Sequence, residues 1–533
     1  MRDGKQVFLI HSGFGFQSSE KYVQYRQQLI GDHVFYIYKM ILLCISALLV
    51  ILYLLCNRQF SYWKLKKVPF DKPFLFFGSF FYVTFRKEHV FDRIRIIYNK
   101  FSTPYVGIYI FHQPVLVVRS PELVKRILVK DFDKFVNRNV ARNLSADPLA
   151  FYTVFISKDE IWRCLRSKFS SAFTPLKMKM MSSSIKECAE NLSCYLSSHS
   201  GETLEIKSVM KKFSTDITSS YAFGIETLCL HHEDSEIFKM ATRLVDTTSF
   251  IRSVSILSYF FLPRLVDIFK LTFLDKPATD YFCSLFKETL KLREKSKIIR
   301  NDFLDILINF SNSEVTMDSY DCDNETIMAS QAITFFTAGS DTIAITLSLT
   351  FYELALNKVV QDRLRTELRE AVHKKGPPTW DMLENVKYLD MVVSEILRKY
   401  PLAPMLNRRA EADYLFQETG FTLDKGVSIL VPVSGLHYDP DFYPDPYKYD
   451  PERFSEENRS KIKPYTYLPF GDGPRNCIGK KFALSVIKMG IAYAIKDFEF
   501  GVSDKTSIPL RFDPASIFVQ EKQGIYLKIS KIA

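Results

Sequence analysis

The sequence predicts a mainly α-helical protein with a small β component, built as a single large domain behind one N-terminal transmembrane helix. Three observations support this fold class. An uncharged apolar run lies near the N-terminus, most of the remaining chain carries apolar residues at helical spacing, and no low-complexity linker or internal repeat divides it. The 533 residues are 47% hydrophobic and 25% charged, which provides a large core and excludes an intrinsically disordered chain.

The charge balance and the cysteines restrict the environment of the protein. The formal net charge is +11, an excess that suits an anionic membrane, nucleic acid or an acidic protein partner. The nine cysteines are scattered without a CxxC pair, so we expect mostly free thiols in a reducing compartment. Composition alone does not choose among the partners, but the N-terminal run favours membrane lipid, and we expect no nucleic-acid partner.

The first predicted element is a transmembrane anchor at residues 34–56. Within it, residues 40–56 carry no charge, and about 20 apolar residues suffice to span a bilayer as a helix. The alternatives are a signal peptide, although no small-residue cleavage site follows, and a buried core helix. Basic residues are more frequent after the run, which favours a cytosolic C-terminal bulk. Residues 1–33 form no recognisable module and are expected to be an extension of unknown role, with Met40 as an alternative start.

Behind the anchor, the chain is predicted to pass through a linker into one large domain. Residues 57–78 are basic and contain prolines, which is typical of a semi-rigid spacer, and residues 79–533 follow as the domain. Helices are expected from the apolar spacing at 180–198, 205–223, 278–311, 324–356, 358–373, 381–400 and 479–496. Short strands are expected at 105–118, at 421–432 and near the C-terminus.

The chemistry is concentrated in a glycine-rich stretch at residues 470–479. The pattern FxxGxRxCxG has five fixed positions, which are Phe470, Gly473, Arg475, Cys477 and Gly479. Chance would supply this pattern on the order of once in 10⁴ such sequences. The glycines allow tight turns and close approach of a flat ligand, and N–H groups at the start of the next helix stabilise a thiolate at Cys477. Arg475 suits an anionic group on the ligand. The alternative is an inert cysteine in a turn.

This stretch resembles the haem-binding loop of the cytochrome P450 family of haem-thiolate monooxygenases. The resemblance extends from the anchor to the C-terminus and is strongest to the microsomal insect detoxification clade, through RNDFLDIL at 300–307, FFTAG at 335–339 and MLNR at 405–408. It implies the cytochrome P450 fold, a haem-binding catalytic domain at 79–533, and haem b (iron protoporphyrin IX) as cofactor. By the same resemblance, Cys477 is the axial ligand of the haem iron.

A Glu-x-x-Arg motif is the first of three further matches to the family. Glu395 and Arg398 lie at i and i+3 on a predicted helix, and Arg453 follows in the sequence PERF. Read alone, Glu395 and Arg398 would be a surface pair worth well under about 1 kcal/mol. The resemblance implies that all three residues form a buried charged triad that locks the scaffold around the haem, a structural role.

The second match concerns the haem propionates. Trp162 and Arg166 lie at i and i+4 on a predicted helix, and an amphipathic surface helix is the alternative interpretation. The resemblance implies that Trp162, Arg166, Arg138 and Arg408 bind the propionates, with Arg409 leaving the last assignment uncertain by one residue. Bidentate arginines suit carboxylates, so several arginines converging on two propionates is sensible chemistry.

The third match is the sequence AGSDT at residues 338–342, in the middle of the apolar helix expected at 324–356. The resemblance implies that Gly339 opens the helix for dioxygen, while Asp341 and Thr342 organise waters that deliver protons. The alternative is a helix kink in which Thr342 bonds back to a carbonyl group. Ile343 departs from the family, which often has a second hydroxyl at this position.

The resemblance implies a monooxygenase that inserts one oxygen atom from O2 into a lipophilic small molecule, either a xenobiotic or an endogenous lipid or hormone. Electrons would come from NADPH through NADPH–cytochrome P450 reductase, and a role for cytochrome b5 stays open. We expect a single-pass protein of the endoplasmic reticulum membrane with a cytosolic catalytic domain. Two alternatives stay open at this point: a haem-thiolate isomerase or dehydratase that needs no O2, and a non-catalytic haem-binding sensor.

Overall fold

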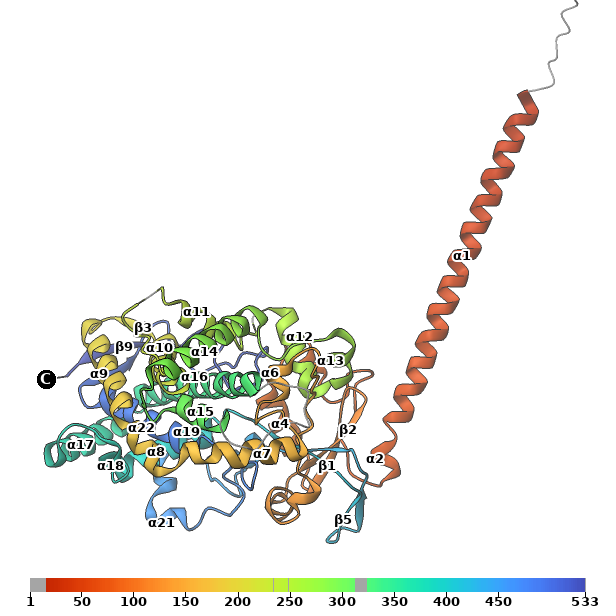
Figure 1. Cartoon of the computed structure of the whole chain (residues 1–533). Coiled ribbons are helices and arrows are strands. Elements are labelled where there is room, and N and C mark those ends of the chain that lie inside the picture. Colours follow the sequence, from red (N-terminus) through yellow and green to blue (C-terminus); the bar gives the residue numbers. More distant parts are fainter. Residues whose placement is uncertain (1–15, 233, 248, 312–323, 533) are drawn as a thin grey trace, which may run out of the picture. The chain divides into compact units, whose positions relative to one another are not determined.

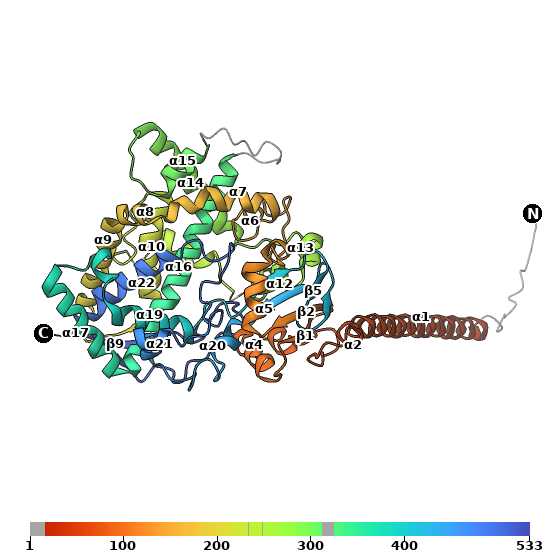
Figure 2. The same cartoon turned by 90° about the horizontal axis from the view of Figure 1, so that it is seen from below.

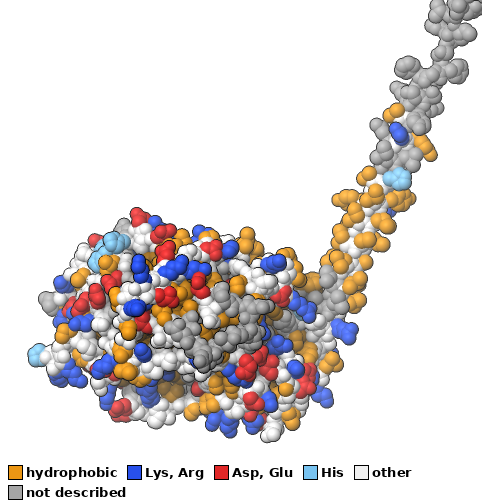
Figure 3. Space-filling model, in the orientation of Figure 1, with side chains coloured by type: hydrophobic (Ala, Val, Ile, Leu, Met, Phe, Trp, Pro, Cys, Tyr) orange, Lys and Arg blue, Asp and Glu red, His pale blue; other side chains and the backbone are white. Residues whose placement is uncertain are grey.

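The computed structural model describes residues 16–232, 234–247, 249–311 and 324–532 and divides into two compact units, Met1–Tyr62 and Trp63–Ala533. The first unit is dominated by one helix, α1 (Phe16–Gln59). Its stretch His33–Ile51 is long and apolar enough to cross a membrane and is not buried in the structure. Figure 3 shows hydrophobic side chains along this stretch. The span agrees in place with the predicted anchor, and α1 also includes residues 16–33 of the predicted extension, whereas residues 1–15 lie outside the described residues.

The second unit is mainly helical (Figure 1). After α1, the helices of the first half of the chain are α2 (Tyr62–Leu65), α3 (Phe81–Thr84), α4 (Val90–Asn99), α5 (Pro121–Lys125), α6 (Pro148–Phe151), α7 (Asp159–Ser170), α8 (Pro175–Met180), α9 (Ser182–Ser198), α10 (Ile206–Phe223) and α11 (Glu236–Arg243). Those that follow are α12 (Phe250–Phe261), α13 (Pro263–Phe269), α14 (Lys276–Ser296), α15 (Phe303–Ser311), α16 (Asn324–Leu356), α17 (Lys358–Lys375), α18 (Trp380–Leu383), α19 (Lys387–Lys399), α20 (Val433–His437), α21 (Glu456–Arg459) and α22 (Lys480–Ile495).

Three small sheets make up the β component. The largest has the order β1-β2-β7-β4 and consists of β1 (Tyr105–Ile110), β2 (Gln113–Val118), β7 (Ser428–Val431) and β4 (Leu406–Arg409). Only the β2–β7 pair in it is parallel. A second sheet joins β3 (Thr203–Glu205), β9 (Tyr526–Lys531) and β8 (Phe498–Val502), and a hairpin joins β5 (Tyr414–Phe416) and β6 (Phe421–Leu423). Figure 2 shows the β1–β2 sheet at one side of the unit and the helices around α16 at the other.

Helix α16 lies in the centre of the core, because it is apolar on nearly every side. Its bounds match the predicted helix at 324–356, and most of its side chains from Ile327 to Leu354 are buried. Helix α10 packs along it and is itself almost completely buried. A helix that is apolar all round is stable only inside a protein, which places residues 338–342 in the interior of the unit.

Two predicted helices are each split in the structure. The helix expected at 278–311 divides into α14 and α15 because Lys297 and Asn301 adopt left-handed backbone conformations, with φ of 54° and 59°. Arg293 of α14 then binds Asp302 and Asp305 at the start of α15, which fixes the turn. The helix expected at 381–400 divides into α18 and α19. Apolar spacing continues across both breaks, so periodicity alone does not reveal them.

The predicted linker at 57–78 needs correction. Trp63 is fully buried, and its Nε1 donates to the carbonyl of Ile108 at 2.8 Å. Asp71 is also buried. It forms ion pairs with Arg93 in α4 and with Lys100, which directly follows α4. The folded unit therefore starts at Trp63 rather than at residue 79, and Phe70 and Gly78 of this segment form bridges to Gly107 and Ile110 of β1.

Candidate active site

The loop that carries Cys477 is shaped by two backbone constraints. Gly473 has φ of +73°, and a Cβ there would lie 1.8 Å from the carbonyl oxygen of Leu128, so only glycine fits. The N–H of Cys477 donates to the carbonyl of Phe470 at 2.8 Å, which closes the loop. Helix α22 starts at Lys480, immediately after Gly479. The thiol therefore lies at a helix N-terminus, as the sequence predicts.

Cys477 combines an accessible side chain with surroundings that affect the charge of its thiol. Its side chain is exposed, yet burial by the surrounding protein raises the pKa of its thiol. The N–H of Gly479 and the positive charges of Arg166, Arg138 and Lys480 act in the opposite direction on that pKa. The thiol is thus accessible to a ligand, and the N–H group and cations around it favour its thiolate.

Three arginines beside this loop, Arg138, Arg408 and Arg475, form a cationic cluster in which Arg408 and Arg475 are buried and Arg138 is half-buried. Arg475 donates only to backbone carbonyls and to Asn137, and its Nη1 has no partner among the described residues. The Nε of Arg408 is likewise unsatisfied. Within the described chain, none of the three forms an ion pair with a carboxylate. Burial, together with mutual repulsion, lowers the pKa to about 10 at Arg138, about 9 at Arg408 and about 8 at Arg475. Buried, unpaired cations of this kind mark an anion-binding site.

Two residues predicted to bind the propionates have other partners. Arg166 donates to the backbone and side-chain oxygens of Asn476 at 2.8 and 2.6 Å, so it supports the residue next to Cys477. The guanidinium of Arg475 lies 4.1 Å from the ring centre of Trp162, a cation–π contact. Arg408, and not its half-exposed neighbour Arg409, is the residue that joins the cluster. The assignment of Arg408 to the propionates stays a prediction, with Arg408 rather than Arg409 in the cluster.

The middle of α16 presents an accessible face in an otherwise buried helix. Ala338 is exposed, and Thr342 lies one turn later on the same side. The Thr342 hydroxyl donates to the carbonyl of Ala338 at 2.6 Å, as in the alternative interpretation of this motif, and α16 continues through this point without a break. At Gly339, a Cβ would lie 2.7 Å from Cγ2 of Thr218, so the missing side chain lets α10 approach. The role of Gly339 toward dioxygen stays a prediction.

Glu395, Arg398 and Arg453 come together as the sequence predicts. Glu395 and Arg398 are fully buried and form a bidentate pair at 2.7 and 2.8 Å. Arg453 lies 3.5 Å from the same carboxylate, which also accepts the N–H of Asp450 at 3.0 Å. Both carboxylate oxygens are satisfied, and the group stabilises the scaffold because removal of Glu395 or Arg398 would leave a buried charge without its main partner.

Sequence reasoning missed the role of His437, which connects this triad to the cysteine loop. Arg398 donates to the carbonyl of His437 at 2.9 Å. The Nε2 of His437 accepts the N–H of Leu468 at 2.8 Å, two residues before Phe470. Since Nε2 accepts, Nδ1 donates to the carbonyl of Arg398 at 2.9 Å, which fixes a neutral tautomer. Burial lowers the pKa of His437 to about 3. The sequence places this histidine in a turn, HYDP, but gives no sign of its partners.

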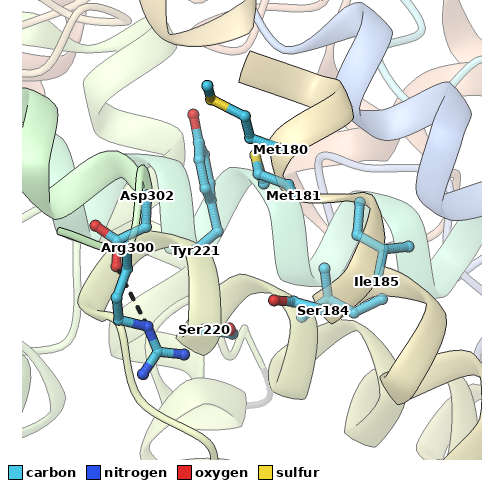
Figure 4. A pocket seen from close by; sticks show the side chains of 9 residues that line it. Met180, Met181, Ser184, Ile185, Ser220, Tyr221, Arg300 and Asp302 are labelled. Carbon is cyan, nitrogen blue, oxygen red and sulfur yellow. Dashed lines mark ion pairs between the residues drawn. The ribbon is translucent and has the colours of Figure 1, made fainter. Parts of the chain in front are cut away.

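A small pocket opens away from these residues, between α9, α10 and the segment before α15 (Figure 4). Figure 4 shows Tyr221, Met180 and Met181 around it and Arg300 directed at Asp302. Its volume of about 40 Å³ has room for a few water molecules only, and it includes none of the predicted site residues. It is therefore not a candidate for the substrate site.

Comparisons with known proteins agree with this geometry. The family model of cytochrome P450 matches residues 68–529. The chain is 36% identical to cytochrome P450 6k1 of Blattella germanica over 92% of its length and 97% of that protein. It is 35% identical to cytochrome P450 6j1 of the same species, over 90% of its length and 96% of that protein. It is also 35% identical to cytochrome P450 6A1 of Musca domestica, over 89% and 94% respectively.

Proposed function

The chain belongs to the cytochrome P450 family of haem-dependent monooxygenases, and from this premise we propose that it oxidises a lipophilic xenobiotic, lipid or hormone with electrons from NADPH. NADPH–cytochrome P450 reductase is the proposed electron donor, with cytochrome b5 as an additional partner. We place the protein in the endoplasmic reticulum membrane, held by the span in α1, with the catalytic unit in the cytosol. The apolar span and the excess of basic residues after it support this placement.

One observation carries the proposal. A largely buried cluster of arginines without a carboxylate partner among the described residues lies beside the loop that presents Cys477. Haem has a flat iron-containing ring and two propionate carboxylates, and it would satisfy both features. Arg138, Arg408 and Arg475 carry positive charge without a carboxylate partner among the described residues, and Arg408 and Arg475 also have unsatisfied N–H groups, all of which suit the propionates. No group of three His, Cys, Asp or Glu side chains able to hold a metal occurs among the residues that the structure describes. Cys477, whose thiol lies beside the arginine cluster at the start of α22, is the proposed protein ligand of the iron.

The protein residues would divide the work as follows. Bound haem supplies the iron at which dioxygen is activated. Cys477 binds that iron as a thiolate, held by the closed loop and by the N–H groups at the start of α22. Phe470, Gly473 and Gly479 keep the loop close to a flat ligand, and Trp162 and Arg166 support the arginine cluster and Asn476.

Thr342 and Asp341 are the proposed proton relay. The Thr342 hydroxyl donates its hydrogen bond to the carbonyl of Ala338. Its oxygen can therefore still accept a hydrogen bond from a water molecule. That water would carry protons toward the accessible side of α16, where Ala338 and Thr342 lie. Asp341, the next residue toward the N-terminus, supplies the titratable group that a bound water and a hydroxyl lack.

The proposal is tested with purified holoenzyme in vesicles, supplied with reductase and a panel of labelled xenobiotics, hormones and fatty acids. We expect hydroxylated product only when reductase, NADPH and O2 are all present, with one NADPH consumed per product in a coupled reaction. Turnover without O2 would contradict the monooxygenase and favour the isomerase or dehydratase. Haem binding without NADPH consumption for any compound would favour the sensor.

Electron delivery is expected to depend on Lys480 and Lys481. Both lysines are exposed at the start of α22, and the ammonium of Lys480 lies 5.8 Å from the ring centre of Phe470. Replacing both by glutamine should slow reduction by reductase at low salt and have less effect at high salt, because such charges steer association and are screened over about 8–10 Å. Stopped-flow reduction measures the rate. Glutamine at Lys374 and Lys375, exposed at the end of α17, is the matched control, and equal rates for both variants would remove the α22 lysines from the interface.

A further inference from the structure

The pocket of Figure 4 has a smaller neighbour, which we call the acidic hollow. The residues that carry its chemistry are Ser184, Glu187, Cys188, Asp216, Ser220 and Glu226. Ser184 of α9 and Ser220 of α10 line both spaces, so the pocket and the acidic hollow lie side by side. The acidic hollow has a volume of about 20 Å³, next to about 40 Å³ for the pocket. None of these residues belongs to the haem site proposed above.

The acidic hollow contains a buried carboxylate without a counter-ion. Asp216 is 5% exposed, and its Oδ1 accepts the Thr227 hydroxyl at 2.6 Å and the N–H of Cys229 at 2.7 Å. Neither Asp216 nor Glu187 forms an ion pair with a lysine or arginine of the described chain. A buried charge that lacks a partner is costly, so the acidic hollow favours a cation.

The thiol of Cys188 responds to the same negative charge. Burial raises the pKa of this thiol, and the carboxylates of Asp216, Glu187 and Glu226 raise it further. The acidic hollow also lies at the C-terminal end of α10, because Ser220 belongs to the last turn of that helix. The final carbonyl groups of a helix carry partial negative charge and stabilise a nearby cation. Side chains and backbone therefore act in the same direction.

Two hydroxyl groups between the pocket and the acidic hollow have no partner. Ser220 is 8% exposed, and neither its hydroxyl nor that of Ser184 forms a hydrogen bond with another described residue. A helical hydroxyl often donates to the carbonyl one turn earlier, as Thr218 does to Ser214 at 2.8 Å. Ser220 lines the space that the pocket and the acidic hollow share instead. A buried hydroxyl of this kind is a second, independent indication of a ligand.

From this geometry we propose that the acidic hollow binds a primary ammonium group at the end of a short aliphatic chain. About 20 Å³ holds one water-sized group, which admits an –NH3⁺ group but not a guanidinium or a trimethylammonium head. The three N–H donors of the ammonium suit Asp216 and the hydroxyls of Ser184 and Ser220. The aliphatic chain would lie in the pocket of Figure 4, whose apolar wall includes Met181 and Ile217.

Arg300 borders the pocket and would repel an ammonium, but its own charge is compensated. Its guanidinium lies 3.4 Å from the carboxylate of Glu226 and 3.9 Å from that of Asp302. Figure 4 shows the arginine directed at Asp302, away from Ser184 and Ser220. The charge available to a ligand is therefore that of Asp216 and Glu187.

The proposal is tested by photolabelling the full-length holoenzyme with a butylammonium probe that carries a diazirine on its chain. Mass spectrometry after proteolysis should locate the label on residues of the pocket and the acidic hollow. Propylammonium should compete for labelling, whereas propanol and tetramethylammonium should not, at equal concentration and ionic strength. An acetylated tripeptide with a central lysine is the last competitor. Competition by this peptide assigns the site to a lysine side chain of a protein, and its failure assigns the site to free amines.

Two variants remove one charge each and keep an oxygen that accepts hydrogen bonds, Asp216→Asn and Glu187→Gln. Labelling should fall about tenfold in Asp216→Asn and about threefold in Glu187→Gln, because the exposed carboxylate of Glu187 is screened by solvent. Glu190→Gln is the matched control, since Glu190 is exposed on the same helix and pairs with Lys186.

Three results would overturn the proposal. They are label spread over the protein surface, equal competition by propanol, and equal labelling of Glu187→Gln and Glu190→Gln. Glu187 is exposed, so Glu187→Gln stays informative even where Asp216→Asn does not fold. The labelling does not depend on turnover, so its result is independent of the proposed function.

Discussion

Replacing Cys477 by serine is expected to abolish the red-shifted absorbance band that reduced protein shows with carbon monoxide when a thiolate binds the haem iron. Serine keeps the shape of the loop, because the backbone N–H of residue 477 still donates to the carbonyl of Phe470. The serine hydroxyl, however, does not ionise at neutral pH. Difference spectroscopy of the reduced, carbon-monoxide-treated protein measures the band. The expected loss is complete.

Cys164 and Cys283 supply matched controls. Both side chains are partly buried, and burial raises the pKa of each thiol, to about 11 at Cys283. Cys164 lies inside α7 and Cys283 inside α14, so neither thiol has the free N–H groups of a helix N-terminus that lie next to Cys477. Cys164→Ser and Cys283→Ser should therefore keep the full band. A band that survived in Cys477→Ser would refute the assignment of the ligand.

Removal of the Thr342 hydroxyl is expected to separate NADPH consumption from product formation. Thr342→Ala should bind haem and accept electrons normally, because the hydroxyl contacts only the carbonyl of Ala338. Without the oxygen that holds the relay water, NADPH oxidation should continue while product falls and hydrogen peroxide rises. The loss should approach the roughly 10²–10⁴-fold typical of acid–base contributions, reduced where a water replaces the hydroxyl. Product, peroxide and NADPH are measured together.

Thr346 provides the control one turn further along α16. Its hydroxyl donates to the carbonyl of Thr342 at 2.8 Å, the same kind of bond, but its side chain is buried in the core. Thr346→Ala should thus lose an equivalent hydrogen bond and stay coupled. Fully coupled turnover in Thr342→Ala would count against the relay. Equal uncoupling in both variants would assign the effect to the helix rather than to the hydroxyl.

The sequence predicts the local parts of this protein well, because these parts depend on neighbouring residues. The bounds of α16 follow from its continuous apolar pattern, and the Cys477 loop follows from glycines at fixed spacing. The segment 57–78 was predicted wrongly as a linker because prolines are typical of spacers, whereas burial of Trp63 depends on a strand that follows about 45 residues later. Pro69 and Pro73 are compatible both with a free linker and with a segment that packs on the domain.

The missing parts of the candidate site all depend on contacts between distant segments. Lys211 of α10 donates to Asp341 of α16, 130 residues later, and the N–H of Leu468 donates to His437, 31 residues earlier. A lone lysine on a helix predicts nothing by itself, since most lysines are exposed. Arg166 was assigned by resemblance to the propionates, but its bonds to Asn476 depend on how closely α7 approaches the loop. Such approach distances follow from the packing of the whole core.

The close approach of Gly473 to Leu128 has a consequence for the order in which the site forms during synthesis. The cysteine loop is shaped by segments made far earlier: Arg138 contacts Arg475 across 337 residues, and Arg166 contacts Asn476 across 310. The N-terminal half of the chain emerges from the ribosome long before Cys477 is synthesised. Until then, Arg138 and Arg166 do not have their partners in the cysteine loop. Contacts of such long separation form late and slowly. The cofactor can therefore be captured only near the end of translation, by a chain that is already almost complete.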